Sequence, residues 1–123
     1  AALDPTFPEV HDPRNAARMN CGVCLTKYTG ARGKGGTNDA SAETLSYVTN
    51  VFDDAGVAWQ TGELGKVDQG GGGTIAKFVS NRNVDTVDIG VPMLSMHAPF
   101  ELVAKQDVLM TYRAFLAFAT AKQ

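Results

Sequence analysis

The sequence lacks both a long apolar run and a strong excess of charge of one sign. No stretch of its 123 residues approaches the roughly eighteen apolar residues that a membrane-spanning helix needs. Eleven basic and thirteen acidic residues give a formal net charge of −2, which leaves no electrostatic footprint for nucleic acid or an anionic membrane. We therefore expect neither partner. The first residues also lack the basic and apolar regions of a signal peptide, so the expected compartment is the cytoplasm.

Cysteine and histidine, two common zinc ligands, are scarce, with two residues of each. Cys21 and Cys24 form a Cys-Gly-Val-Cys motif, but no second pair of ligands follows at the spacing of a zinc knuckle. The motif falls in a predicted strand rather than at a helix N-terminus, where redox thiols lie. We therefore expect two buried strand cysteines. His11 lies among prolines and acidic residues and is expected to be an exposed loop histidine.

Apolar periodicity predicts alternating strands and helices after an irregular lead-in over residues 1–20. The expected strands cover 23–28, 57–61 and 85–89, and the expected helices cover 39–55, 74–80 and 108–121. Asn38 or Asp39 is the expected cap of the first helix, and Gly56 its C-terminal glycine. A β-α-β-α-β-α order over 21–123 predicts an α/β fold, a three-layer α/β/α sandwich with a mostly parallel sheet. Three strands make a small sheet, which indicates part of a larger domain.

The last predicted helix has a clear apolar side. Asp107 is the expected cap, and the apolar residues recur at spacings of three and four. The side chains expected on this packing face are Leu109, Tyr112, Phe115, Leu116 and Ala119.

Two glycine-rich segments interrupt the pattern. The segment 29–37 carries basic residues but lacks the order of a phosphate loop, because Lys34 is followed by Gly35 and Gly36. We expect a mobile basic loop bordering a cleft rather than a nucleotide cradle. The run Gly70–Gly73 precedes the short helix, and it is either a surface loop or a place where backbone amides approach an anion.

The segment after the third predicted strand holds the main functional candidate. Gly90 and Pro92 end that strand, and His97 follows in a loop just past its carboxyl end. Ligands gather at such places in open α/β sheets. From the residues alone, His97 is either a structural histidine or a ligand. Glu101, four residues later, is either structural, a support for the site or a direct ligand.

Several motifs together resemble the C-terminal part of the aspartyl aminopeptidase and vacuolar aminopeptidase I family, the eighteenth family of metallopeptidases. They are Gly-Gly-Gly-Gly-Thr-Ile over 70–75, Thr-Val-Asp-Ile-Gly-Val-Pro-Met-Leu-Ser-Met-His over 86–97, and the helix over 107–118. Leu-Thr-Lys-Tyr over 25–28 and Leu-Asp-Pro-Thr-Phe over 3–7 add to the match. The resemblance covers essentially the whole chain.

The resemblance implies a co-catalytic zinc aminopeptidase with an α/β/α catalytic domain that forms large homo-oligomers. His97 matches the last metal-ligating histidine of the family. Lys27, Gly73 and Thr74 match residues lining the substrate cleft. Glu101 is a candidate to hold the metal-binding histidine in place. The family binds two zinc ions per site, and its other ligands match positions before Ala1. The substrate is thus a peptide N-terminus, and this chain alone is expected to supply one ligand and to be inactive.

Two other kinds of function stay open. The chain is alternatively a structural or assembly module without catalysis. It is otherwise an anion-binding α/β module that uses the glycine run before the short helix and the basic loop over 27–34.

Overall fold

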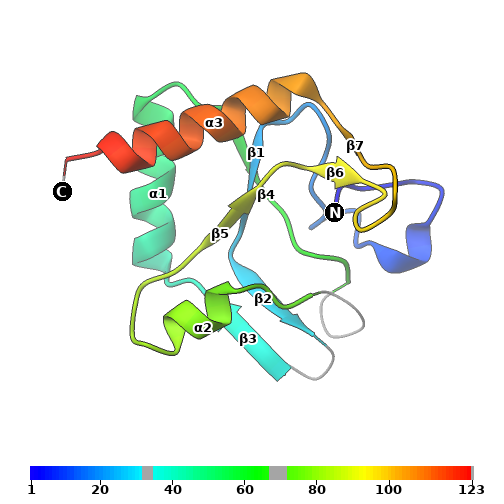
Figure 1. The fold of residues 1–123 in the computed structure, drawn as a ribbon, viewed down its shortest axis with the longest axis horizontal. Helices are drawn as coiled ribbons and strands as arrows, with labels where there is room; N and C mark the ends of the chain where they lie inside the picture. The colour runs from blue at the N-terminus through cyan, green and yellow to red at the C-terminus, as the bar shows by residue number, and fades with distance from the viewer. Residues whose placement is uncertain (32–34, 67–71, 123) are drawn as a thin grey trace.

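A computed structural model describes residues 1–31, 35–66 and 72–122 (Figure 1). Residues 32–34 and 67–71, which include Gly70 and Gly71 of the glycine run, lie outside the described part. The short first helix is the 3-10 turn η1 (Pro8–Val10). The strands are β1 (Val23–Thr26), β2 (Tyr28–Ala31), β3 (Gly35–Asp39), β4 (Trp59–Thr61), β5 (Asp88–Gly90), β6 (Met93–Leu94) and β7 (Leu102–Val103). The α-helices are α1 (Ala42–Asp54), α2 (Ala76–Ser80) and α3 (Lys105–Thr120).

The central sheet has the order β4-β1-β5 and is mixed. Strand β1 pairs with β4 in parallel and with β5 in antiparallel orientation. The predicted α/β class is confirmed, but the prediction that β5 continues a parallel sheet is wrong. The reason lies in the preceding helix. α2 is five residues long and packs against β3 rather than lying over the central sheet, so it is no crossover helix.

The core forms where α1 and α3 pack against one face of β1. Val23 and Leu25 of β1 alternate toward this face and contact Val48 and Phe52 of α1 and Met110 of α3. Ser41 caps α1 at its N-terminus, and its hydroxyl accepts a hydrogen bond from the Thr44 N–H at 3.1 Å. The expected caps, Asn38 and Asp39, instead belong to β3. Gly56 follows the helix with φ 64°, as predicted for a C-terminal glycine.

The start of α3 is tied to the segment before β1 by a buried carboxylate. Asp107 is 0% exposed and accepts hydrogen bonds from the backbone N–H groups of Asn20 (2.7 Å) and Gly22 (2.8 Å). The prediction that Asp107 caps the helix is wrong, because α3 begins at Lys105 after Ala104.

No helix in the described part of the chain is long and apolar enough to cross a membrane.

The buried side of α3 differs from the side predicted from its pattern. Met110 and Ala114 are buried, whereas Leu109, Tyr112 and Phe115 are exposed. Because α3 is apolar on two sides, periodicity found one apolar face and could not tell which of the two the chain itself buries.

The segment predicted as a mobile basic loop is instead built around the antiparallel hairpin β2–β3. Glycine is disfavoured in strands, so the glycine-rich composition did not predict β2 or β3. Residues 32–34, which also belong to the predicted basic loop, lie outside the described part. The two cysteines also separate, with Cys24 buried in β1 and Cys21 exposed before it. Gly22 between them has φ 92°, and a Cβ there would meet the Ala58 carbonyl oxygen at 2.1 Å. This glycine turn makes the strand start only at Val23, so Cys21 is not in it.

Candidate active site

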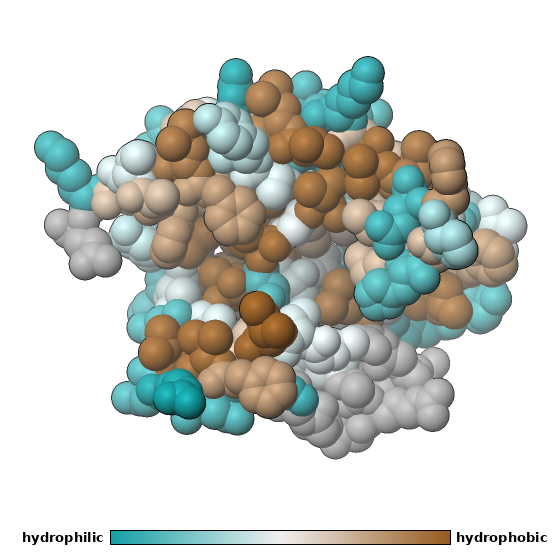
Figure 2. Space-filling model, in the orientation of Figure 1, coloured by the Kyte–Doolittle hydropathy of each residue, from teal (hydrophilic) through white to brown (hydrophobic). Residues whose placement is uncertain are grey.

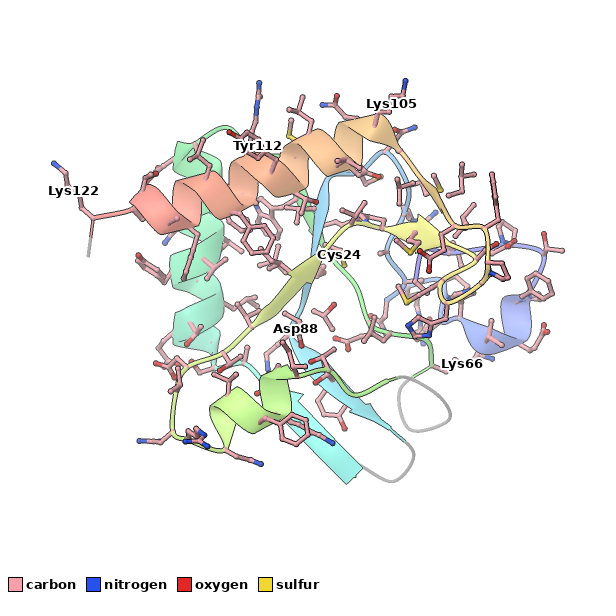
Figure 3. All side chains as sticks on the ribbon, viewed as in Figure 1. Cys24, Lys66, Asp88, Lys105, Tyr112 and Lys122 are labelled. Atoms are coloured by element: carbon pink, nitrogen blue, oxygen red, sulfur yellow. The ribbon has the colours of Figure 1, made fainter. Side chains whose placement is uncertain are left out.

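The candidate site is a cavity of about 750 Å³ beside the β6–β7 hairpin. Three stretches far apart in the sequence form it: the N-terminal segment, the chain on either side of 67–71, and the end of β6. The Ala2 N–H donates to the Met93 carbonyl at 2.7 Å, which holds the N-terminal segment against β6. The lining residues include Asp4, Phe7, Glu9, Val10, His11, Leu64, Lys66, Gly73, Thr74, Met93, Leu94, Met96 and His97. One of these lining residues, Lys66, is labelled in Figure 3, on the right of the view.

His97 sits in a tight turn that directs it to the cavity. Ser95 and His97 have φ of 55° and 69°, in the left-handed region that non-glycine residues rarely adopt. The Ala98 N–H donates to the Ser95 carbonyl at 2.9 Å and closes the turn. The side chain of His97 is exposed, and no hydrogen bond within the described residues engages its imidazole. As far as the described residues go, the ring nitrogens are thus accessible to a ligand.

Glu101 acts on the backbone of this turn. Its carboxylate accepts a hydrogen bond from the His97 N–H at 2.7 Å. The contact closes a loop of five residues between the two strands of the β6–β7 pair. An anionic acceptor makes this a charge-assisted hydrogen bond, which is stronger than a neutral one. Among the three possibilities left open by the sequence, the geometry favours a support for the His97 turn.

Gly73 and Thr74 line the same cavity as His97, but the Thr74 hydroxyl has partners of its own. It donates to the Asp88 carboxylate at 2.7 Å and accepts from the Ala76 N–H at 3.2 Å. Asp88 lies on β5 (Figure 3), so this contact ties the start of α2 to the central sheet. Sequence reasoning missed Asp88, which looked like an ordinary polar residue alternating along a strand. These two hydrogen bonds hold Thr74 at the cavity wall.

Lys27 is not among the residues that line the cavity. Its ammonium forms an ion pair with Asp39 across the start of the β2–β3 hairpin. Glu63 belongs to the same neighbourhood: burial raises the pKa of its carboxyl, and the charge of Asp39 adds to this rise. A hydrogen bond from the Tyr28 backbone and the charge of Lys27 oppose it, each lowering that pKa. Glu63 carries no sequence signal of its own, because only folding brings it to the hairpin.

His11 lies in the cavity wall, contrary to the prediction of an exposed loop histidine. It is only 7% exposed, and its Nδ1 is buried without a hydrogen-bond partner among the described residues. The charged neighbours Glu9 and Asp12 suggested exposure, but the backbone after η1 folds back, and Ala17 pairs with Ala2. Asp4 lies near it: the Thr6 N–H chiefly lowers the Asp4 pKa, and the charge of His11 adds a small part.

The chain by itself does not assemble a complete metal centre within the described residues, where no group of three or more His, Cys, Asp or Glu could hold a metal ion. His97 nevertheless places an exposed imidazole, a nitrogen donor that zinc favours, at the wall of a cavity. The donor present thus fits zinc as one ligand of a larger set.

Comparison with known proteins decides the family. The family model described as "Aminopeptidase I zinc metalloprotease (M18)" matches residues 1–119. The chain belongs to the aminopeptidase I family. The resemblance inferred from the motifs over 70–75 and 86–97 is thereby confirmed.

Named relatives of this aminopeptidase I family chain agree in sequence and in fold. A probable M18 family aminopeptidase 1 of Thermotoga maritima is 53% identical over 115 residues, covering 94% of this chain and 26% of the relative. The same-named protein of Clostridium acetobutylicum is 46% identical over 118 residues, covering 96% of this chain and 25% of the relative.

Solved structures give the same result. A crystal structure of the Thermotoga maritima aminopeptidase superposes with a TM-score of 0.89 at 52% identity, covering 95% of this chain and 26% of that one. Aminopeptidase I of Clostridium acetobutylicum superposes with a TM-score of 0.91 at 45% identity, covering 98% and 26%. The chain therefore spans about a quarter of the length of these relatives.

Proposed function

We propose that this chain is the C-terminal part of a zinc-dependent metalloaminopeptidase that removes N-terminal residues from peptides. One observation carries the proposal. In a chain of the zinc metalloprotease family, His97, whose imidazole makes no hydrogen bond to the described residues, shares a 750 Å³ cavity with Gly73 and Thr74. A binding cleft with a few convergent polar groups is the usual form of a catalytic site.

The proposed role of His97 is to hold one of two zinc ions through its neutral imidazole. The remaining ligands would come from the rest of the parent protein. When bound, the zinc pair supplies activation of water and of the scissile carbonyl near neutral pH. The chain's own contribution is orientation. The Glu101 carboxylate supports the His97 turn, and the Thr74–Asp88 contact holds the segment that carries Gly73 and Thr74.

Gly73 and Thr74 are proposed to bind the substrate. The Thr74 hydroxyl already has two partners, so the backbone of the two residues, rather than that hydroxyl, is the part free to contact a peptide. Lys27 stays a predicted substrate-binding residue. Its ammonium pairs with Asp39, so an acidic substrate side chain would have to compete with that carboxylate.

The remaining parts of the proposal concern the parent protein. It acts as a large homo-oligomer in the cytoplasm, a compartment that suits the two free cysteines of this chain. The 123-residue chain alone supplies one ligand and is inactive. Anion binding is less favoured as a function, because α2 has only five residues and the Thr74 hydroxyl already accepts the Ala76 N–H of its first turn.

Removal of metal from the parent protein tests this proposal. Hydrolysis of aminoacyl p-nitroanilides by the purified parent is expected to stop after treatment with a chelator and to return when zinc is added. The isolated chain serves as the control and is expected to show no hydrolysis with or without zinc. Turnover that survives complete removal of metal would refute a zinc peptidase.

A further inference from the structure

The outer face of α3 is a continuous apolar stripe with nothing packed on it in the described structure. Its members are Val108, Leu109, Tyr112, Phe115 and Leu116, which are between 42% and 63% exposed. We call these five residues the α3 stripe. In Figure 2 hydrophobic side chains gather along the top of the molecule, where Figure 1 places α3.

Helix geometry separates the stripe from the buried side of α3. At about 100° per residue, its five side chains project within an arc of roughly 120°. Asp107, Met110 and Ala114, which are buried against β1, α1 and the segment before β1, project from the opposite side. Beyond its first turn, α3 carries one charged side chain, that of Arg113. The next charged residue, Lys122, follows the end of the helix.

A helix with two opposite apolar faces is typical of a helix buried on both sides. Single exposed apolar residues are normal on protein surfaces, but a contiguous apolar stripe marks a contact surface. These five side chains are each about half exposed, so covering them would bury further apolar surface and stabilise the fold.

We propose that the α3 stripe is covered by the rest of the parent polypeptide, so that α3 is an internal helix of the complete catalytic domain. This inference rests on the proposed position of the chain in a longer peptidase. The same fold occurs with TM-scores of 0.89 and 0.91 in relatives of which it forms 26%. Nearly three quarters of such a chain therefore remains to cover the stripe. A second copy of this chain is the competing occupant.

Cysteine labelling in the full-length parent tests the proposal without measuring catalysis. Leu116→Cys is placed in a Cys21→Ser background, because Cys21 is exposed and Cys24 is buried. Val84→Cys is the matched control, since Val84 is 51% exposed and Leu116 50%. Reaction of Leu116→Cys with a maleimide should be at least about tenfold slower in the native parent than in urea, as local opening must precede reaction. Val84→Cys should be slowed less.

The outcomes separate the possible occupants. Protection of Leu116→Cys that persists on dilution supports the proposal. Labelling as fast as in urea, protection equal to that at Val84, or protection that disappears on dilution would overturn it, the last because it indicates a second copy. If Leu116→Cys fails to fold by circular dichroism, Leu109→Cys at the other edge of the stripe is judged by the same criteria. Loss of catalysis with a protected stripe would contradict only the proposed function.

Discussion

At the scale of single residues, the site includes a turn with two residues in an unfavourable backbone conformation. His97 and Ser95 occupy the left-handed region, which costs free energy for residues with a Cβ, and a neighbouring contact must offset that cost. Glu101 supplies it by accepting the His97 N–H. The carboxylate therefore positions the imidazole through the backbone and not by touching the ring.

Removal of the Glu101 carboxylate should weaken zinc binding in the parent protein. We expect Glu101→Ala to raise the zinc Kd by about tenfold, at the lower end of the range for residues that orient metal ligands. Glu101→Gln keeps an acceptor for the His97 N–H and should change the Kd far less. Competition with a chromogenic chelator measures both values. Equal zinc affinity of Glu101→Ala and the wild type would show that the turn holds itself.

Residue identities predicted part of the site and missed another part. His97 was singled out because it follows a predicted strand, and Gly73 and Thr74 because they match the family's motif. All three line one cavity. His11 was missed because its neighbours along the chain are polar. Its burial depends on a fold-back of the N-terminal segment that no local pattern encodes.

At the scale of elements, the buried Asp107 joins α3 to the segment that leads into β1. Its two carboxylate oxygens accept one backbone N–H each, from Asn20 and Gly22. Loss of the acceptor would leave two donors in a region where Asp107 itself is fully buried. An unsatisfied buried donor is more costly than a missing surface contact.

Substitution of Asp107 should therefore destabilise the fold strongly. We expect Asp107→Ala to lower the free energy of unfolding by about 3 kcal/mol, since hydrogen bonds to charged groups contribute about 1.5–3 kcal/mol each and the side-chain cavity partly relaxes. Asp107→Asn keeps one acceptor oxygen and the shape of the side chain, so its loss should be smaller. Urea denaturation followed by circular dichroism gives both values. Identical stabilities of Asp107→Ala and Asp107→Asn would contradict this account.

Periodicity predicted the positions of the elements better than their partners. α1 and α3 were located within a few residues because their apolar side chains recur at helical spacing. The direction of β5 was wrong, since direction depends on where α2 packs and not on the pattern within either element. The hairpin β2–β3 was missed because backbone pairing, rather than apolar alternation, defines its glycine-rich strands.

At the scale of the whole molecule, the described chain resembles one side of an active site more than a complete one. Two histidines, His11 and His97, line one cavity, and no group of the described residues could hold a metal by itself. A helix carries a second apolar face that the chain does not cover. The sequence predicted only three strands, fewer than most sheets have, and the chain spans 26% of the Thermotoga maritima relative.

The zinc content of the parent protein tests the central claim, that His97 is a zinc ligand. Elemental analysis after gel filtration is expected to give two zinc ions per wild-type subunit and about one in His97→Ala, because removal of one ligand from a centre with few ligands empties that position. His11→Gln, which alters the other histidine in the same cavity, is the matched control and should keep both ions. Equal zinc content in His97→Ala and the wild type would contradict the account.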